Sequence, residues 1–411
     1  MATWTNIAPM ATARIHFSTE VIDSKIYAIG GNNQGQLLSS TEEYDLTTNT
    51  WTALANMSTK RSHLQTAVID GKIYAIGGLM GDNLSTASTE VYDPDSNTWT
   101  ELASMTYSRY IFQAAVVNGR IYVMGGAHDH QISSFVESYD PTTNIWTTLA
   151  SMNAIRIQFQ HAVIDGKIYV FGGSGAGNSS STEVYDPDSN TWTTLASMQT
   201  ARSYFKSEVI NGKIYAIGGG GSAGRLSSVE VYDPTTNTWS TRADMSTARK
   251  DFDTQVVDGK IYAIGGEGDN GKLSSAEVYD PATNDWSSLL DMSTAREYVK
   301  AEAIDGKIYA IGGLGGSTYL ASAEVLESFT PQPVEDGHAL LNVYMVDGTL
   351  KEYDLTMAEV DAFIEWYDQR AIGTGTDYFI IQKTYNKGPF TSRKDYIVFD
   401  KIRDFEVNRY E

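Results

Sequence analysis

The chain has 411 residues, no cysteine and a formal net charge of −21 at pH 7. Hydrophobic residues make up 41% of it and charged residues 20%, a composition typical of globular proteins. The lack of cysteine excludes disulfides, thiolate metal sites and cysteine nucleophiles. The negative charge argues against nucleic acid as a partner, because we find no basic stripe that would offset it.

The N-terminal stretch MATWTNIAPMATARIHF has no basic segment followed by an apolar run, so we expect no secretory signal. No segment approaches 18 consecutive apolar residues, and we therefore expect no direct insertion into a membrane. The location stays open between the cytoplasm and delivery as part of a particle or by a non-classical route.

A nine-residue stretch, DGKIYAIGG at residues 70–78, recurs seven times with small changes. The second glycines of the copies follow one another at intervals of 46–48 residues, and a tryptophan recurs in step with them. A constant period of this length indicates a repeat architecture. The glycines are Gly31, Gly78, Gly126, Gly173, Gly219, Gly266 and Gly313, and the tryptophans are Trp4, Trp51, Trp99, Trp146, Trp192, Trp239 and Trp286.

Each repeat reads as four short β-strands. In residues 61–78, two alternating apolar runs flank Asp70-Gly71, a pair that favours a tight hairpin turn. In residues 88–105, two more runs flank a turn that begins with Asp-Pro. Val, Ile, Tyr, Thr and Trp at period two exclude a stack of helical repeats. Four strands of this kind correspond to one blade of a β-propeller.

The two ends of the repeat region complement each other. The seventh repeat has its glycine doublet and the sequence AEVLES, but no tryptophan follows in register. The first residues, TWTNIAPM, have the sequence of the missing fourth strand. We therefore predict that the N-terminal strand completes the seventh blade, which would hide two exposed sheet edges.

These motifs carry a family resemblance. The glycine doublet that ends strand two, the Glu-x-Tyr-Asp of strand three and the tryptophan beyond it resemble kelch repeats, over about four-fifths of the chain. The resemblance implies an all-β, seven-bladed kelch propeller at residues 1–330. Function does not follow from it, because kelch propellers include scaffolds, adaptors and a few enzymes.

The repeats vary in length only between the glycine doublet and the glutamate of strand three, in the loop that joins strands two and three. The sequence of this loop differs in every repeat, and variable loops on a rigid framework are a common place for recognition. The loop residues that we expect to bind a ligand are Asn83, His128, His130, Phe135, Arg225, Asp269 and Tyr319.

A second variable position follows the recurrent Met-x-x-x-Arg motif. Two residues after each arginine the identity changes, to His16, His63, Ile111, Gln158, Tyr204, Asp251 and Tyr298. In the kelch propellers that the chain resembles, this position lies at the mouth of the central channel and often contacts ligand. We expect His16, His63, Gln158, Tyr204, Asp251 and Tyr298 to bind ligand together with the loops.

Other recurrent residues are better explained by structure. The arginines of the motif are present in every repeat, which favours a structural role over a ring that binds an anion. The tyrosines and tryptophans of the repeats are expected to pack between blades. His128 and His130 lie two residues apart in AHDHQ, but we expect a surface loop there and no metal site.

The sequence offers little support for catalysis. Copper-radical oxidases built on kelch propellers need a cysteine crosslinked to a tyrosine, and the chain has no cysteine. No nucleophile elbow, phosphate loop or serine triad is visible. We therefore expect no enzymatic activity and no cofactor. The alternative is a carbohydrate-active enzyme, isomerase- or lyase-like, that uses the polar residues of the channel mouth.

After a linker at residues 331–337 that contains two prolines, residues 338–411 read as a small α+β domain. A hairpin turns at Asp347-Gly348, and Thr356 with Glu359 forms a capping box for a helix that runs to about Ala371. Three more strands are expected in YFIIQKT, DYIVFDKI and DFEVNRY. This module is similar to one at the C-terminus of surface or phage-tail-like proteins of Gram-positive bacteria.

Two functional hypotheses result. The first is a recognition or adhesion protein that binds a protein or surface glycan through the variable rim, with the C-terminal domain as a tether or assembly module. The second is the carbohydrate-active enzyme. Both parts of the chain are acidic, since residues 331–411 hold 15 acidic and 9 basic residues and the remainder carries a net charge of −15.

Overall fold

The structure is a computed structural model that describes residues 3–81, 84–128, 130–175, 179–327, 338–347, 349–371, 376, 378–383 and 393–410. The chain forms two compact units, Met1–Ser328 and Phe329–Glu411. None of the helices within the described ranges is long and apolar enough to cross a membrane.

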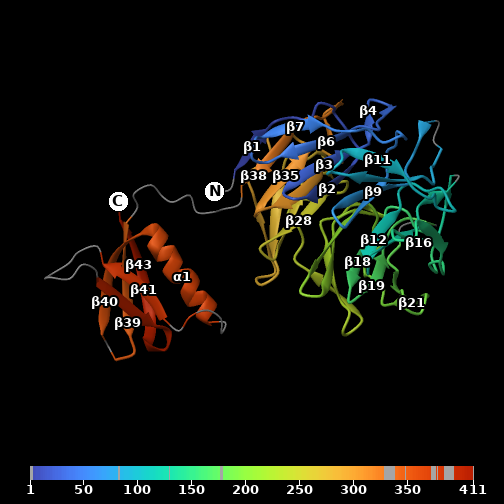
Figure 1. Ribbon diagram of the computed structural model, residues 1–411. Coiled ribbons are helices and arrows are strands. Elements are labelled where there is room, and N and C mark those ends of the chain that lie inside the picture. Colours follow the sequence, from blue (N-terminus) through green and yellow to red (C-terminus); the bar gives the residue numbers. More distant parts are fainter. Residues whose placement is uncertain are drawn as a thin grey trace. The chain divides into compact units, whose positions relative to one another are not determined.

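The first unit consists of antiparallel sheets of four strands, which confirms the prediction of an all-β repeat structure (Figure 1). The first strands of the seven sheets contact one another in chain order, and β34 in turn contacts β2. These first strands are β2 (Ser18–Ile22), β8 (Gln65–Ile69), β12 (Gln113–Val117), β18 (Gln160–Ile164), β22 (Lys206–Ile210), β28 (Asp253–Val257) and β34 (Lys300–Ile304).

Each first strand pairs with the second strand of its sheet through the tight Asp-Gly or Asn-Gly turn, or Asp-Ser in the first repeat. At Asp70 and Gly71 the φ angles are 50° and 70°, the left-handed pair that a type I′ turn requires. The second strands are β3 (Lys25–Ile29), β9 (Lys72–Ile76), β13 (Arg120–Met124), β19 (Lys167–Phe171), β23 (Lys213–Ile217), β29 (Lys260–Ile264) and β35 (Lys307–Ile311).

Six of the seven third strands carry the Glu-x-Tyr-Asp motif, which the seventh repeat replaces by Glu324-Val325-Leu326-Glu327, and the fourth strands carry the tryptophan. The third strands are β6 (Thr41–Asp45), β10 (Thr89–Asp93), β16 (Val136–Asp140), β20 (Thr182–Asp186), β26 (Val229–Asp233), β32 (Ala276–Asp280) and β38 (Ala323–Leu326). The fourth are β7 (Thr50–Ala53), β11 (Thr98–Glu101), β17 (Ile145–Thr148), β21 (Thr191–Leu195), β27 (Thr238–Arg242), β33 (Asp285–Ser288) and, from the other end of the chain, β1 (Trp4–Ile7). Strand β1 pairs with β38 in antiparallel register from Trp4 opposite Leu326 to Ile7 opposite Ala323.

The repeated side chains join each sheet to the one before it. The Trp99 indole N–H donates to the carbonyl of Ala55 in the preceding repeat, at 3.0 Å. The side-chain oxygen of Asn97 accepts hydrogen bonds from the Tyr92 hydroxyl and from the backbone N–H of Ala55. The same contacts recur around Trp146, Trp192, Trp239 and Trp286. The prediction that these aromatic residues pack between repeats is confirmed.

The glycine doublet is required by two close backbone approaches, one from the next repeat and one from its own repeat. At Gly77, with a φ of 56°, a Cβ atom would lie 2.7 Å from the carbonyl oxygen of Arg109. At Gly78, with a φ of 109°, it would lie 2.8 Å from the carbonyl oxygen of Ser62. Both positions therefore combine a left-handed backbone with a close approach of another backbone segment, which glycine alone permits.

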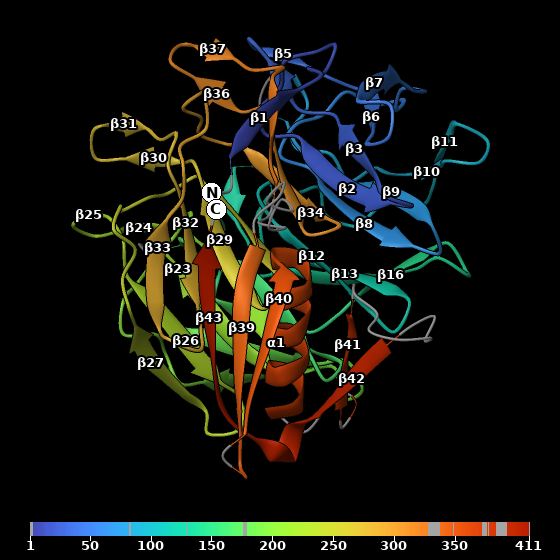
Figure 2. The same cartoon turned by 90° about the vertical axis from the view of Figure 1, so that its left-hand side faces the viewer.

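Among the residues that the structure describes, small two-stranded hairpins follow the doublet in five of the repeats, and several of them are labelled in Figure 2. They are β4–β5 (Asn32–Asn33 and Gln36–Leu37), β14–β15 (Ala127–His128 and Gln131–Ile132), β24–β25 (Gly220–Gly221 and Gly224–Arg225), β30–β31 (Glu267–Gly268 and Gly271–Lys272) and β36–β37 (Leu314–Gly315 and Thr318–Tyr319).

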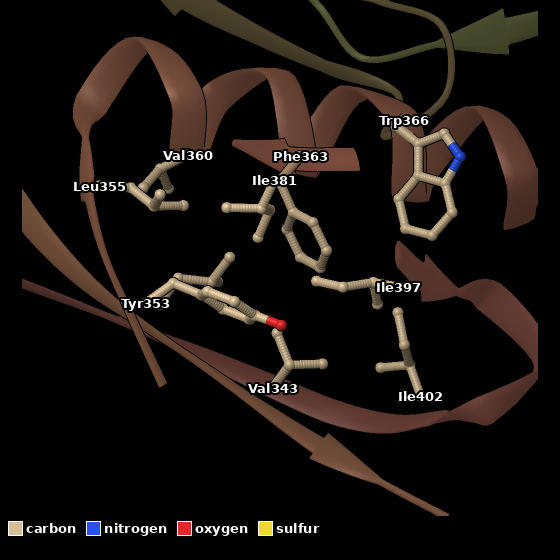
Figure 3. Packing of buried hydrophobic residues seen from close by; sticks show 10 residues of the cluster. Val343, Tyr353, Leu355, Val360, Phe363, Trp366, Ile381, Ile397 and Ile402 are labelled. Carbon is tan, nitrogen blue, oxygen red and sulfur yellow. The ribbon is translucent and has the colours of Figure 1, made fainter. Parts of the chain in front are cut away.

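The second unit pairs β39 (His338–Met345) with β40 (Leu350–Thr356) on one side and β43 (Ile402–Tyr410) on the other, and α1 (Met357–Ala371) contacts both β39 and β40. A hairpin of β41 (Tyr378–Lys383) and β42 (Arg393–Val398) completes it. Phe363 and Trp366 of α1 pack into a buried cluster with Ile381 and Ile397, as Figure 3 shows. The stretch expected to be one strand at DYIVFDKI is interrupted by a 3-10 turn at Phe399–Lys401.

Candidate functional site

The variable loops and the variable positions after the arginine lie on the same side of the sheets. In each repeat, the residue after the arginine forms a β-bridge to the residue directly after the glycine doublet. Examples are Ser62 with Leu79, Tyr110 with Ala127 and Lys250 with Glu267. The Asp-Gly or Asn-Gly turns are at the opposite ends of the first strands. One side of the propeller therefore varies between repeats and the other does not.

The seven variable positions after the arginines, which we call the mouth residues, gather around one cavity of about 200 Å³. All seven have φ angles of 50–55°, in the left-handed region that residues other than glycine rarely adopt. Backbone hydrogen bonds link neighbours among them: His63 N–H donates to the His16 carbonyl and Tyr298 N–H donates to the Asp251 carbonyl, both at 2.9 Å. They are His16, His63, Ile111, Gln158, Tyr204, Asp251 and Tyr298.

The aromatic mouth residues contact one another. The rings of His16 and His63 stack with centroids 3.9 Å apart, and the Tyr298 ring lies 4.5 Å from that of His16. The Gln158 side-chain amide donates to the Tyr204 hydroxyl. Burial lowers the pKa of His16 to about 3, with smaller contributions from His63 and Lys300, and lowers that of His63 to about 4. Both imidazoles are therefore neutral at pH 7.

Asp251 is the one acidic mouth residue. Its side chain is 7% exposed, and Lys250 Nζ lies 3.5 Å from its Oδ2 atom. Lys250 also pairs with Glu267 at 2.9 Å, and Glu267 in turn pairs with Arg225 of the neighbouring hairpin. Burial raises the pKa of Asp251 to about 6, against the opposing charge of Lys250. A buried carboxyl with a pKa near neutrality is typical of a functional site.

A second layer of polar residues lines the same cavity, at the first residues of the first strands. Lys206, which begins β22, pairs with Asp253, which begins β28, at 2.7 Å. Lys300, which begins β34, also lines the cavity. These residues were not among those expected from the sequence to bind ligand. Comparing the repeats would have found them, because the other four have serine or glutamine at this position.

Further carboxyl groups follow on the same strands. Glu208 and Glu302 lie two residues beyond Lys206 and Lys300, so they face the same side of their strands. The Thr254 hydroxyl donates to Glu208 at 2.6 Å. Burial raises the pKa of both glutamates to about 7, with hydrogen bonds from Thr254 and Thr19 opposing the shift.

None of the predicted loop residues that the structure describes lines the cavity. Phe135 stacks on Tyr107 with centroids 4.1 Å apart, and His128 packs edge-on against Tyr107. Arg225 reaches Asp269 at 3.5 Å. His130 and Tyr319 lie in the hairpins β14–β15 and β36–β37, and Asn83 lies outside the described residues. The rim thus has an aromatic side near Tyr107 and a charged side near Arg225.

The recurrent arginines are structural, as predicted. Each is at most 1% exposed and pairs with the glutamate of strand three in its own repeat, at 2.7–2.9 Å in five of the repeats. In the fifth repeat, Arg202 also donates to the carbonyls of Gly218 and Ser228, and Glu230 accepts the backbone N–H groups of Gln199 and Thr200. Because each arginine is buried and paired with a glutamate, the arginines are not available to a ligand.

Comparison with known proteins agrees with the repeat structure. The KLHDC2/KLHL20/DRC7 Kelch-repeats domain matches residues 2–126 and 111–313, most of the chain. The chain is a kelch-repeat protein. An uncharacterized protein of Clostridium acetobutylicum is 38% identical over 72 residues, and the match covers 18% of this chain and 18% of that relative.

Two solved structures share the fold. The kelch-repeat chain resembles YjhT with a TM-score of 0.56 and 17% identity, over 69% of this chain and 99% of that one. It also resembles a fungal alcohol oxidase of the AA5 family in complex with copper, with a TM-score of 0.66 and 18% identity, over 86% of this chain and 90% of that one. At these identities the likeness concerns the fold.

The second likeness corrects one expectation. We expected no enzymatic activity, but an oxidase has the same fold over most of this kelch-repeat protein. The inference failed because a missing cysteine excludes one crosslinked cofactor and leaves other chemistry open. The described residues do not fit a copper centre, since they contain no group of three or more His, Cys, Asp or Glu side chains placed to hold a metal. We therefore derive no step through copper.

Proposed function

We propose that the seven four-stranded sheets are the blades of one closed propeller, in which β1 supplies the outer strand of the last blade. The contacts of the first strands, which return from β34 to β2, support closure. So does the register of β1 on β38. We place the propeller at residues 1–330, the linker at 331–337 and the α+β domain at 338–411.

The propeller acts as a recognition module that binds a partner through the side bearing the mouth residues and the hairpins. The observation that carries this proposal is the set of seven left-handed mouth residues around one cavity. Glycine would relieve the backbone strain at each position, at about 1–2 kcal/mol per residue. None of the seven is glycine, and one is the β-branched Ile111. Strain kept at one place favours a role for the side chains there.

Kelch-repeat domains generally bind other proteins, so a protein is the partner that we propose first. The half-buried aromatic cluster of Tyr107, His128 and Phe135 offers stacking surface, and the charged hairpins around Arg225 and Lys250 offer ion pairs. Aromatic and arginine side chains of this kind supply much of the binding energy at protein interfaces. The C-terminal domain serves as a tether or assembly module.

The test uses the full-length protein as bait, with covalent crosslinking and identification of the captured proteins. A triple variant, Tyr204→Ala with Tyr298→Ala and His128→Ala, should lose the captured partner. A matched variant on the turn side, Lys72→Ala with Asp93→Asn, should keep it. A glycan array read with the same three proteins is the second arm, and a glycan hit lost in the triple variant would replace the protein partner by a glycan. Equal capture by all three proteins would refute recognition through this side.

A second candidate is general acid–base chemistry on a carbohydrate in the same cavity. The observation in its favour is Asp251, a cavity-lining carboxyl whose burial raises its pKa to about 6. Groups that titrate near the working pH are the most efficient proton-transfer catalysts. Asp251→Asn should then abolish turnover of sugars screened by NMR for isomerisation or elimination, while leaving folding intact. No turnover by the wild-type protein would dismiss this candidate.

A further inference from the structure

The cavity contains two charges of opposite sign that the protein itself does not pair well. Its volume of about 200 Å³ is below the range of about 300–1,000 Å³ that drug-sized ligands occupy, so it suits a smaller molecule. Most buried charges in the first unit are paired, as the arginine–glutamate pairs show. The exceptions at the cavity therefore indicate what is bound there.

The negative charge belongs to Asp251. Its Oδ2 atom is buried and has no hydrogen-bond partner among the described residues. The nearest cation, Lys250, lies 3.5 Å away and is 2.9 Å from Glu267. Glu267 also holds Arg225, so Lys250 is shared within a larger acidic and basic network. A buried carboxylate oxygen without a donor is costly, and a donor in the cavity would offset that cost.

The positive charge belongs to Lys300. Within the part of the chain that the structure describes, its ammonium group has no hydrogen bond and no ion pair. The adjacent acid, Asp253, is already used: one oxygen pairs with Lys206 at 2.7 Å and the other accepts the backbone N–H of Ala301 at 2.9 Å. Burial lowers the pKa of Lys300, and the nearby charge of Lys206 lowers it further.

Apart from Lys206, whose charge is paired with Asp253, the remaining wall of the cavity is neutral. It includes the rings of His16, His63, Tyr204 and Tyr298 together with glutamine and apolar side chains. The propeller carries a net charge of −15, which repels a simple anion at long range. A simple cation would leave Lys300 unpaired. A molecule that has both charges but no net charge meets neither objection.

We propose that the cavity binds a small zwitterion, whose ammonium group pairs with Asp251 and whose carboxylate pairs with Lys300. The ligand class is that of molecules of amino-acid size with one primary ammonium and one carboxylate. The aromatic mouth residues cover its apolar part and exclude water from the two ion pairs. This inference goes beyond the recognition of a macromolecule by the rim and does not depend on it.

The experiment measures binding to the full-length protein by calorimetry and ligand-observed NMR. The probes are the free α-amino acids, together with γ-aminobutyrate and 6-aminohexanoate, which place the two charges farther apart. Each probe that binds is compared with its decarboxylated amine and its N-acetylated acid. We expect both of these derivatives to bind at least about tenfold more weakly than the parent zwitterion.

Two variants assign the charges. The affinity of the Lys300→Met variant for the zwitterion should fall at least about tenfold. This variant should bind the decarboxylated amine as tightly as it binds the zwitterion. The Asp251→Asn variant should instead bind the N-acetylated acid as tightly as it binds the zwitterion. Lys213→Met and Asp233→Asn, an exposed pair far along the sheet from the cavity, should change neither. Circular dichroism and the unfolding midpoint of each variant show whether it is folded.

Several outcomes would overturn the proposal. One is that no probe binds at about 10 mM, a concentration well above the millimolar dissociation constant of a weak specific site. Another is binding that both cavity substitutions leave unchanged. A third is an amine that binds the wild type as tightly as the zwitterion, which would make the site a cation site. The capture experiment with the triple rim variant tests the recognition proposal, and the titrations with small molecules test the zwitterion proposal. Either proposal can therefore fail while the other holds.

Discussion

The left-handed backbone conformation occurs at both ends of the first strands, and the two ends treat it differently. Beside β8, the turn has Asp70 and Gly71 at φ angles of 50° and 70°, while the mouth has His63 at 50°. Asp, Asn and Gly tolerate this conformation, whereas Ile, Tyr and Gln do not. The buried charges divide in the same way: Arg202 is paired with Glu230 at 2.9 Å, whereas Asp251 Oδ2 has no hydrogen-bond partner among the described residues. The framework avoids strained backbone and unpaired charges, whereas the residues around the cavity keep both.

The largest expected effect comes from breaking one of the buried arginine–glutamate pairs of the framework. Arg202→Met leaves Glu230 buried without its cation, and we expect a loss of about 3–5 kcal/mol in the free energy of unfolding. The matched variant Lys213→Met removes a solvent-accessible pair with Asp233 and should destabilise the protein far less. Urea unfolding followed by tryptophan fluorescence measures both. Similar losses for the two variants would mean that the buried pairs do not hold the repeats together.

A smaller effect concerns the acids along the cavity strands. Because burial raises the pKa of Glu208 and Glu302 from 4.5 to about 7, the native state binds more protons than the unfolded state between these pH values. Their contribution to stability is therefore present below pH 4.5 and is lost as the pH rises to about 7. Each Glu→Gln variant should be more stable than the wild type at pH 8 by about 1–3 kcal/mol.

The comparison between variant and wild type is essential here, since the neutral histidines of the mouth act in the opposite direction over part of the same range. The advantage of Glu208→Gln should be absent at pH 4 and complete above pH 7. Glutamine keeps an oxygen that accepts the Thr254 hydroxyl. Thermal unfolding at a series of pH values measures the difference, and an advantage that is independent of pH would contradict the linkage.

Much of this structure could be predicted from the sequence. Period-two patterns and the Asp-Gly turns gave the strands, and differences between otherwise identical repeats pointed to His16, Tyr204 and Asp251. The capping box at Thr356 and Glu359 gave a helix that the structure places at Met357–Ala371. These signals are local, so a single repeat or a single turn of chain is enough to read them.

The rest depends on which repeats are neighbours. Lys206 and Lys300 have the same place in their strands, yet one is paired and the other is not. The difference arises because the second carboxylate oxygen of Asp253, which lies between the two lysines in sequence, accepts the backbone N–H of Ala301. No pattern along the chain contains that geometry. Likewise, the strand expected at DYIVFDKI is broken at Phe399–Lys401, since a periodic apolar pattern does not report a short 3-10 turn.

The smallest effects test the backbone side of the comparison. Gly71 has a φ of 70° and no atom near its missing Cβ, so Gly71→Ala introduces strain without a clash. We expect a loss of about 1 kcal/mol. Ile111→Gly removes strain at a φ of 53° but also removes a half-buried side chain, so stability should change by less than about 0.5 kcal/mol. Losses equal to that of Gly71→Ala, measured by urea unfolding, would show that Ile111 serves the framework. A neutral result, together with weaker binding at the cavity, would show that the protein keeps this strained residue for what it contacts.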